Sequence, residues 1–189
     1  MISNEQLMER FQRNDEAAYV ELVNRLKKPL LNFIFSIVGN REDSEDILQD
    51  VFLKLYTKKE MYKPIATVST WLYTIAKNQC FTHLRWKKIR VHIPLVNKNE
   101  DGEKTFDIPD ESEKHAGKLV ERWQNILLKL QLIPIDFRTV LILRDFQELS
   151  YEEISLILNT PIGTIRSRLN RGRIRLAQMI KNTNGGNIK

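Results

Sequence analysis

The chain has 189 residues with 30 Lys and Arg against 24 Asp and Glu, a formal charge of +6, seven glycines and one cysteine. This length allows one large or two small domains, and the basic excess favours a polyanionic partner. The lone Cys80 excludes an internal disulfide and fits a reducing cytosol, and no apolar run is long enough for a membrane span or a signal peptide. We therefore expect a cytoplasmic protein without membrane insertion.

Helices dominate the predicted structure, since no alternation of apolar and polar residues persists as it would in strands. Apolar residues at helical spacing predict early helices; they are Leu7, Phe11, Ala18, Leu22 and Leu26. The run Leu30–Val38 predicts a further, strongly buried helix that ends at Gly39 and Asn40. Residues 1–90 are therefore predicted to form an all-α domain.

Residues 43–56 predict a helix with two unlike sides. One side is apolar and consists of Ile47, Leu48, Val51, Phe52 and Leu55. The other is a compact acidic face of Asp46, Gln49 and Asp50. Asp46 and Asp50 lie four residues apart with like charge, which costs about 0.2–0.5 kcal/mol in an isolated helix and which a cationic partner would relieve. A solvated acidic face near a helix N-terminus explains the same pattern.

A turn-rich loop at 61–69 leads into a predicted helix over 70–88. The inward stripe of this helix is Leu72, Ile75, Ala76 and Cys80. The opposite row combines hydrogen-bonding, stacking and cationic side chains: Thr74, Asn78, Phe81, Arg85 and Lys88. Such a row is typical of surfaces that follow a nucleic-acid backbone and hold unstacked bases. A core aromatic followed by a solvated basic tail is the alternative interpretation.

Residues 91–117 are predicted to be a flexible acidic linker, because 97–114 carry seven acidic and three basic residues. With few apolar side chains to bury, the linker should be extended or disordered in the free protein, and the blocks on either side should move independently. The second helical domain is predicted at 118–182, followed by a tail at 183–189. It opens with a helical stripe of Leu119, Val120, Trp123, Ile126, Leu127 and Leu130, and a further helix is expected over 134–145.

Residues 149–176 predict two short helices joined by a tight turn, a helix-turn-helix. Ser150 and Glu153 form a capping box at the start of the first helix; after the turn, Thr160 is the expected cap and Pro161 the first residue of the second helix. That helix places Ile162, Ile165, Leu169 and Leu176 on one face, and Ser167 and Arg171 opposite, flanked by Arg166, Asn170 and Arg175. A helix with a buried apolar face and an exposed arginine face is suited to reading the DNA major groove. An ordinary amphipathic helix with a solvated basic face is the alternative.

Together, the segments 43–56, 69–85 and 149–176, in this order with an acidic connector between, make the chain resemble a bacterial RNA polymerase sigma factor of the extracytoplasmic-function group. The resemblance covers about residues 5–90 and 118–180. It implies two small helical domains, sigma region two at 1–90 and sigma region four with its helix-turn-helix at 118–182. It also implies a non-enzymatic initiation factor that supplies promoter specificity to core RNA polymerase.

The site residues carried over by the resemblance fall into three sets. Docking on the clamp coiled coil of the polymerase is expected of Asp46, Gln49 and Asp50. The minus-ten element, duplex and melted strand, is expected to contact Met61, Tyr62, Lys63, Thr74, Asn78, Phe81, Arg85 and Lys88, where the loop would capture a flipped base. The minus-thirty-five element is expected to contact Arg166, Ser167, Asn170, Arg171 and Arg175. Arg166 is the expected base reader, whereas Arg171 and Arg175 are expected to clamp phosphates.

The resemblance also implies that the linker threads toward the polymerase active cleft and RNA exit channel, and it adds an anti-sigma factor as a candidate partner. Two departures from the family pattern concern local structure: Glu148 stands where glycine is common, and Gly172 where alanine is usual. Gly172 should weaken its helix by about 1 kcal/mol relative to alanine. The histidines and Cys80 lack the spacing of metal ligands, and we expect no metal and no cofactor.

Two other classes of protein remain to be weighed against a sigma factor. A stand-alone helix-turn-helix regulator would bind duplex DNA without polymerase, but it has no need of an acidic docking face or of a loop before a mixed aromatic and basic helix. An RNA-binding or structural protein would account for the basic helices but not for the turn at 159–161. Binding to purified core polymerase separates the first interpretation from the other two.

Overall fold

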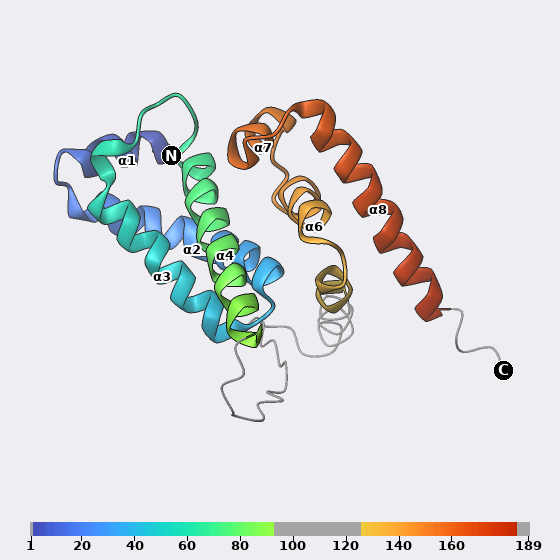
Figure 1. The fold of residues 1–189 in the computed structure, drawn as a ribbon. Helices are drawn as coiled ribbons and strands as arrows, with labels where there is room; N and C mark the ends of the chain where they lie inside the picture. Colours follow the sequence, from blue (N-terminus) through green and yellow to red (C-terminus); the bar gives the residue numbers. More distant parts are fainter. Residues whose placement is uncertain (1, 93–125, 185–189) are drawn as a thin grey trace, which may run out of the picture.

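The structure, a computed structural model, describes residues 2–92 and 126–184, and every regular element in these two ranges is helical (Figure 1). The elements are α1 (Asn4–Gln12), α2 (Glu16–Val38), α3 (Arg41–Thr57), η1 (Lys59–Met61), α4 (Val68–His92), α6 (Ile135–Leu141), η2 (Ile142–Phe146), α7 (Tyr151–Leu158) and α8 (Ile162–Asn184). A short helical segment at 126–131 precedes α6. The all-α fold class is confirmed. Nearly all of the predicted linker, the stripe before Ile126 and most of the tail lie outside the described residues.

Helices α1 to α4 form the first domain. The apolar residues that predicted its early helices are buried, with Phe11 and Leu22 fully so. Leu30–Val38, expected to be a separate helix, continues the preceding one as the single long helix α2, with Pro29 inside it. The stripe of Leu22, Leu26 and Leu30 runs past Pro29 at four-residue spacing, so continuous burial offsets the one missing backbone donor.

Gly39 ends α2 as predicted, with a left-handed φ of 76°. Asn40 starts the next helix, because its side-chain oxygen accepts from the Asp43 amide. Helix α3 buries the predicted apolar side and leaves the predicted acidic face exposed. Along α4, Leu72, Ala76 and Cys80 are fully buried. Ile75, the fourth member of the predicted inward stripe, is only half-buried.

The second described domain contains the predicted helix-turn-helix, formed by α7 and α8. The capping box at Ser150 and Glu153 is present, with the Ser150 hydroxyl accepting from the Glu153 amide at 3.1 Å. Asn159 ends α7 in the left-handed region, at a φ of 48°. Thr160 does not cap α8: its hydroxyl donates to the Leu158 carbonyl, and the helix begins at Ile162, one residue later than expected.

Gly172 allows α8 to lie close to α6. A β-carbon at this position would stand 3.2 Å from the Phe137 carbonyl oxygen and 3.3 Å from Leu141 Cδ1. The close packing of α8 on α6 therefore favours glycine at this position, although helix propensity favours alanine. Replacing Gly172 by alanine should gain less helix stability than propensity alone predicts. The other departure has a backbone cause as well, because Glu148 has a φ of 57°, which glycine adopts without strain.

The two described domains pack against each other instead of lying apart, as free movement about the linker would have implied. Helix α4 lies between the other helices of the first domain and α7, and α8 lies at the outer edge of the second domain (Figure 1). Gln131 Nε2 donates to the Ser36 carbonyl at 2.9 Å, and the Tyr73 hydroxyl donates to Gln147 Oε1. Among the described residues, no helix combines the length and the apolar character of a membrane span.

Candidate nucleic-acid interface and acidic groove

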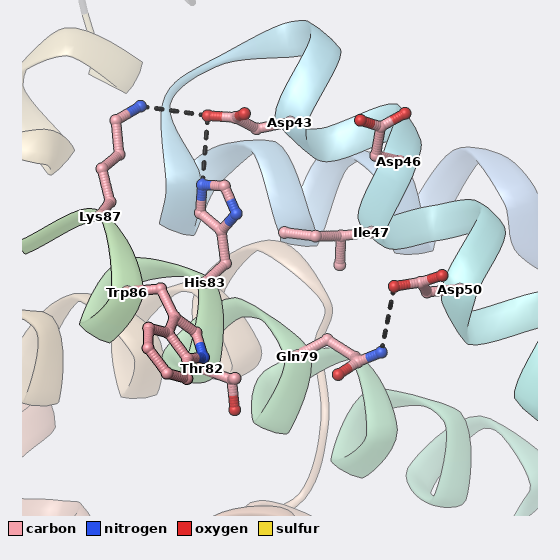
Figure 2. A pocket seen from close by; sticks show the side chains of 9 residues that line it. All are labelled: Asp43, Asp46, Ile47, Asp50, Gln79, Thr82, His83, Trp86 and Lys87. Carbon is pink, nitrogen blue, oxygen red and sulfur yellow. Dashed lines mark hydrogen bonds and ion pairs between the residues drawn. The ribbon is translucent and has the colours of Figure 1, made fainter. Parts of the chain in front are cut away.

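An acidic groove of about 570 Å³ lies between α3 and α4 (Figure 2). Its lining residues are Asp43, Asp46, Ile47 and Asp50 from α3, and Gln79, Thr82, His83, Trp86 and Lys87 from α4. Two residues of the predicted docking set, Asp46 and Asp50, line the groove. The third, Gln49, is exposed on α3 but is not part of the lining.

The carboxylates of the groove divide into one that is neutralised and two that are not. Asp43 Oδ2 lies 3.1 Å from Lys87 Nζ and 3.2 Å from His83 Nε2 (Figure 2). Asp50 accepts a long hydrogen bond of 3.4 Å from the Gln79 amide. No cation of the described residues lies within ion-pair distance of Asp46 or Asp50. The groove therefore keeps two uncompensated negative charges on its α3 wall.

Trp86 adds a large apolar surface to the groove, since it is 56% exposed although it lies beside the acidic wall. An aromatic face next to two free carboxylates is a favourable environment for an arginine side chain, which can stack and form an ion pair at the same time. Trp86, Lys87 and His83 are not among the site residues predicted from the sequence. Their positions on α4 relative to Asp43 depend on how two helices pack, and only the spacing of His83 and Lys87 on one face of α4 gave a signal.

The loop at 61–69 has an inner and an outer side. Met61, Lys63 and Ile65 are exposed. Tyr62 is buried: its ring packs on Trp71 with centroids 5.6 Å apart, and its hydroxyl donates to the Ala66 carbonyl at 2.9 Å. Of the loop residues expected to contact the minus-ten element, Tyr62 therefore braces the loop from within. Met61 and Lys63 remain available at the surface.

The row predicted along α4 is only partly exposed. Asn78, Arg85 and Lys88 are exposed, whereas Thr74 and Phe81 are half-buried. The Thr74 hydroxyl donates to the Thr70 carbonyl, and Lys77 Nζ lies 5.9 Å from the centroid of the Phe81 ring. The first turns of α4 also contact the second domain, where the Thr70 hydroxyl lies 3.4 Å from Glu153 Oε1. The C-terminal half of α4 is therefore more exposed to solvent than its N-terminal half.

The outer face of α8 carries the whole set predicted for duplex DNA: Arg166, Ser167, Asn170, Arg171 and Arg175 are all exposed. On the opposite face, Ile165 and Leu169 are buried. Two further arginines of α8 pair with acidic residues of the same domain, Arg168 with Asp136 at 3.9 Å and Arg173 with Asp145. Arg168 and Arg173 thus have a carboxylate partner, whereas Arg166, Arg171 and Arg175 form no ion pair with any described carboxylate.

Similarity to known proteins follows the same two-part organisation. Residues 22–89 match the family described as Sigma-70 region 2, and residues 123–176 match the family described as Sigma-70, region 4. The chain is 32% identical over 181 residues to the RNA polymerase sigma-H factor of Pseudomonas aeruginosa, covering 90% of each. It is 28% identical over 176 residues to the ECF RNA polymerase sigma factor SigW of Bacillus subtilis, covering 89% of this chain and 92% of that protein.

A solved structure has the same fold. It is that of the sigma factor RpoE in complex with the anti-sigma factor NepR from Bartonella quintana, with a TM-score of 0.71 and 22% identity over 86% of this chain and 96% of that chain. A region 2 and a region 4 in the order of the two described domains, with relatives aligned over nine tenths of the chain, establish the family. The chain belongs to the extracytoplasmic-function group of RNA polymerase sigma factors.

Proposed function

We propose that this chain directs core RNA polymerase to specific promoters, with the acidic groove as the polymerase contact and the two basic helices as the DNA contacts. The observation that carries the proposal is that one chain holds an open arginine face on α8 and, in its other domain, a groove whose free charges are negative. Negative charge repels DNA, so the groove needs a protein partner with basic side chains.

For polymerase docking, we assign the leading role to Asp46 and Asp50. Both are exposed and neither has a cationic partner among the described residues, so a basic helix of the polymerase clamp would gain two ion pairs without first breaking any. Asp43 contributes less, because Lys87 already compensates its charge. Gln49, on the exposed side of the same helix, extends the contact beyond the groove.

For the minus-ten element, we assign the surface contacts to the exposed residues Met61, Lys63, Asn78, Arg85 and Lys88. Thr74 and Phe81 complete the row along α4 once DNA lies against it. Tyr62 acts indirectly, because its packing on Trp71 fixes the loop that presents Met61 and Lys63. A loop fixed in this way can select an extruded base without ordering itself at the same moment.

For the minus-thirty-five element, we assign base reading to Arg166, with Ser167 and Asn170 beside it, and phosphate contacts to Arg171 and Arg175. The Ser167 hydroxyl donates to the Thr164 carbonyl, so its oxygen can only accept from a base or a water. Helix α8 supplies no acidic side chain that would oppose DNA.

A stand-alone helix-turn-helix regulator is not favoured, since region 2 occupies residues 22–89 and has no role in such a protein. An anti-sigma factor is a candidate partner of this chain, because the similar sigma factor of Bartonella quintana was solved in complex with one. The protein itself is proposed to be non-enzymatic and to leave RNA synthesis to the polymerase.

The experiment that tests the docking assignment is charge reversal in the groove. Asp50→Lys should weaken binding to purified core polymerase by about 2–5 kcal/mol, because it replaces an ion-pair partner with a repelling charge. Glu152→Lys, an equal charge change on the exposed first turn of α7, is the matched control and should bind normally. Affinity is measured by titrating labelled chain with core polymerase, and helicity by circular dichroism.

Equal core affinity for Asp50→Lys and the unmodified chain would contradict the assignment of the groove. Failure of the unmodified chain to bind core polymerase at all would contradict the proposed function as a whole. Permanganate footprinting then reports promoter opening: only core polymerase with the full chain should open the DNA, since melting needs the loop at 61–69 held at a set distance from the anchored upstream element.

A further inference from the structure

Arg166 lies against an aromatic ring. Its guanidinium carbon is 5.3 Å from the ring centroid of Tyr151, the first residue of α7. The guanidinium carbon of Arg144 is 4.9 Å from the same centroid, and Arg144 Nη1 donates to the Leu149 carbonyl at 2.7 Å. Tyr151 is half-buried and packs against the core of its domain. The Tyr151 ring is therefore fixed by two contacts, one with the domain core and one with Arg144, which is itself anchored on the Leu149 carbonyl.

This contact differs from those of the α8 arginines that pair with acids. Arg173 donates to Asp145 from Nε and Nη2, and Arg168 Nη1 forms a longer ion pair of 3.9 Å with Asp136 Oδ1. Arg166 makes no ion pair with any described carboxylate. A ring contact attracts the charged plane of the guanidinium and leaves its N–H groups free at the edge, where a guanine would accept them.

A long exposed arginine otherwise loses rotational freedom when it binds a base, and this loss weakens the contact. A ring that already restricts the guanidinium in the free protein reduces the loss. We propose that Tyr151 is a positioning residue that holds Arg166 ready to read a base edge of the upstream promoter element. The proposal rests on the assignment of Arg166 as a base reader under the proposed function.

The test compares four variants in complex with core polymerase: Tyr151→Leu, Tyr151→Phe, Arg166→Ala, and Arg166→Ala combined with Tyr151→Leu. Each complex selects from a pool of duplexes with a randomised upstream element, and sequencing of the bound fraction gives the discrimination at every position. Tyr151→Leu should reduce discrimination about three- to tenfold, and only at the positions that depend on Arg166. Tyr151→Phe keeps the aromatic face and should behave as the unmodified chain.

The double variant should discriminate no worse than Arg166→Ala alone, because the ring then has no arginine to hold. Additive losses, or an equal loss of binding to all sequences in Tyr151→Leu, would show that Tyr151 only supports the fold and would overturn the inference. If Arg166→Ala itself left the selected sequences unchanged, both the assignment of Arg166 and this inference would fail.

A second readout needs no DNA and remains valid if Tyr151→Leu is less stable. Nuclear magnetic resonance of the free chain should show the Arg166 side-chain protons shifted upfield by the ring of Tyr151. Tyr151→Phe should retain the shift and Tyr151→Leu should abolish it, with thermal unfolding measured alongside for each variant. Arg166 proton shifts that are the same with Leu and with Tyr at position 151 would overturn the contact on which the proposal depends.

Discussion

Helices α4 and α8 are both long and lack any Asp or Glu, yet the fold exposes them differently. The outer face of α8 is open along its whole predicted DNA-binding set, whereas the start of α4 lies against α7, with Thr70 and Tyr73 buried. The free chain thus presents the helix proposed to read duplex DNA and partly covers the helix proposed for strand opening. DNA can reach all of α4 only after the two domains separate.

The contacts between the two domains combine a shared buried apolar cluster with hydrogen bonds. Tyr73 and Thr70 of α4 donate to Gln147 and Glu153, and Gln131 donates to the Ser36 carbonyl of α2. A typical hydrogen bond contributes about 0.5–1.5 kcal/mol net, and we expect a tightly bound polymerase to compensate for these bonds and for the apolar contacts when the domains separate. The comparison therefore predicts a closed free chain and an open bound one.

The largest expected effect on this closed arrangement comes from Gly39→Ala. The residue has a φ of 76°, and a β-carbon there would stand 2.9 Å from Gln131 Cδ. Alanine should lower the free energy of unfolding by about 2–4 kcal/mol, through left-handed strain and displacement of Gln131 from the Ser36 carbonyl. Gly163→Ala is the control: nothing lies within 4 Å of its β-carbon position, and it should stabilise α8 by about 0.5–1 kcal/mol. Denaturant unfolding measures both, and equal stabilities would contradict the account of Gly39.

The proposed base reading by the exposed helix α8 is tested by Arg166→Ala. We expect a loss of about 1–3 kcal/mol of discrimination at one or two upstream positions, because a base-edge pair is removed. Arg171→Ala should instead weaken all duplexes alike and lower the salt slope by about 1. Binding of the polymerase complex to duplexes at several salt concentrations distinguishes the two. A uniform loss for Arg166→Ala would make it a phosphate clamp.

The covering of α4 by the second domain is tested by Tyr73→Phe, which has the smallest expected effect. Removing the hydroxyl breaks the hydrogen bond to Gln147 and should destabilise the closed arrangement by about 0.5–1.5 kcal/mol. Binding of a single-stranded minus-ten oligonucleotide by the free chain should rise accordingly. Tyr56→Phe, which loses a hydroxyl contact to Glu16 inside the first domain, is the control. If the two variants bound the strand equally, the contact of Tyr73 with Gln147 would not limit access to α4.

The features that could be predicted from the sequence are those fixed by local spacing. The two faces of α3, the buried stripe of α4 and the capping box at Ser150 each depend on residues three or four positions apart, which share one helix face or one turn. The arginine face of α8 follows from the same periodicity. For this reason the helix-turn-helix was predictable almost to its ends.

What could not be predicted depends on contacts between distant segments. Tyr62 is expected from the resemblance to contact the minus-ten element, but its ring turns inward onto Trp71. Gln12 Nε2 also donates to the Tyr62 carbonyl at 3.2 Å and holds the loop backbone there. The ion pair of Asp43 with Lys87 joins α3 to α4 and depends on how these two helices pack. The packing of the domains is a third case, because the composition of a linker does not determine whether the surfaces on either side bind each other.

The closed free chain and its opening on polymerase are tested most directly by a distance between the domains. Spin labels at Glu42→Cys on α3 and Gln178→Cys on α8 would report it, since both positions are exposed. Cys80 would stay unlabelled, because burial excludes solvent and raises the pKa of its thiol to about 12. Pulsed electron resonance should give one narrow distance in the free chain and a longer one with core polymerase. A broad distribution in the free chain, or the same distance after polymerase binds, would contradict the account.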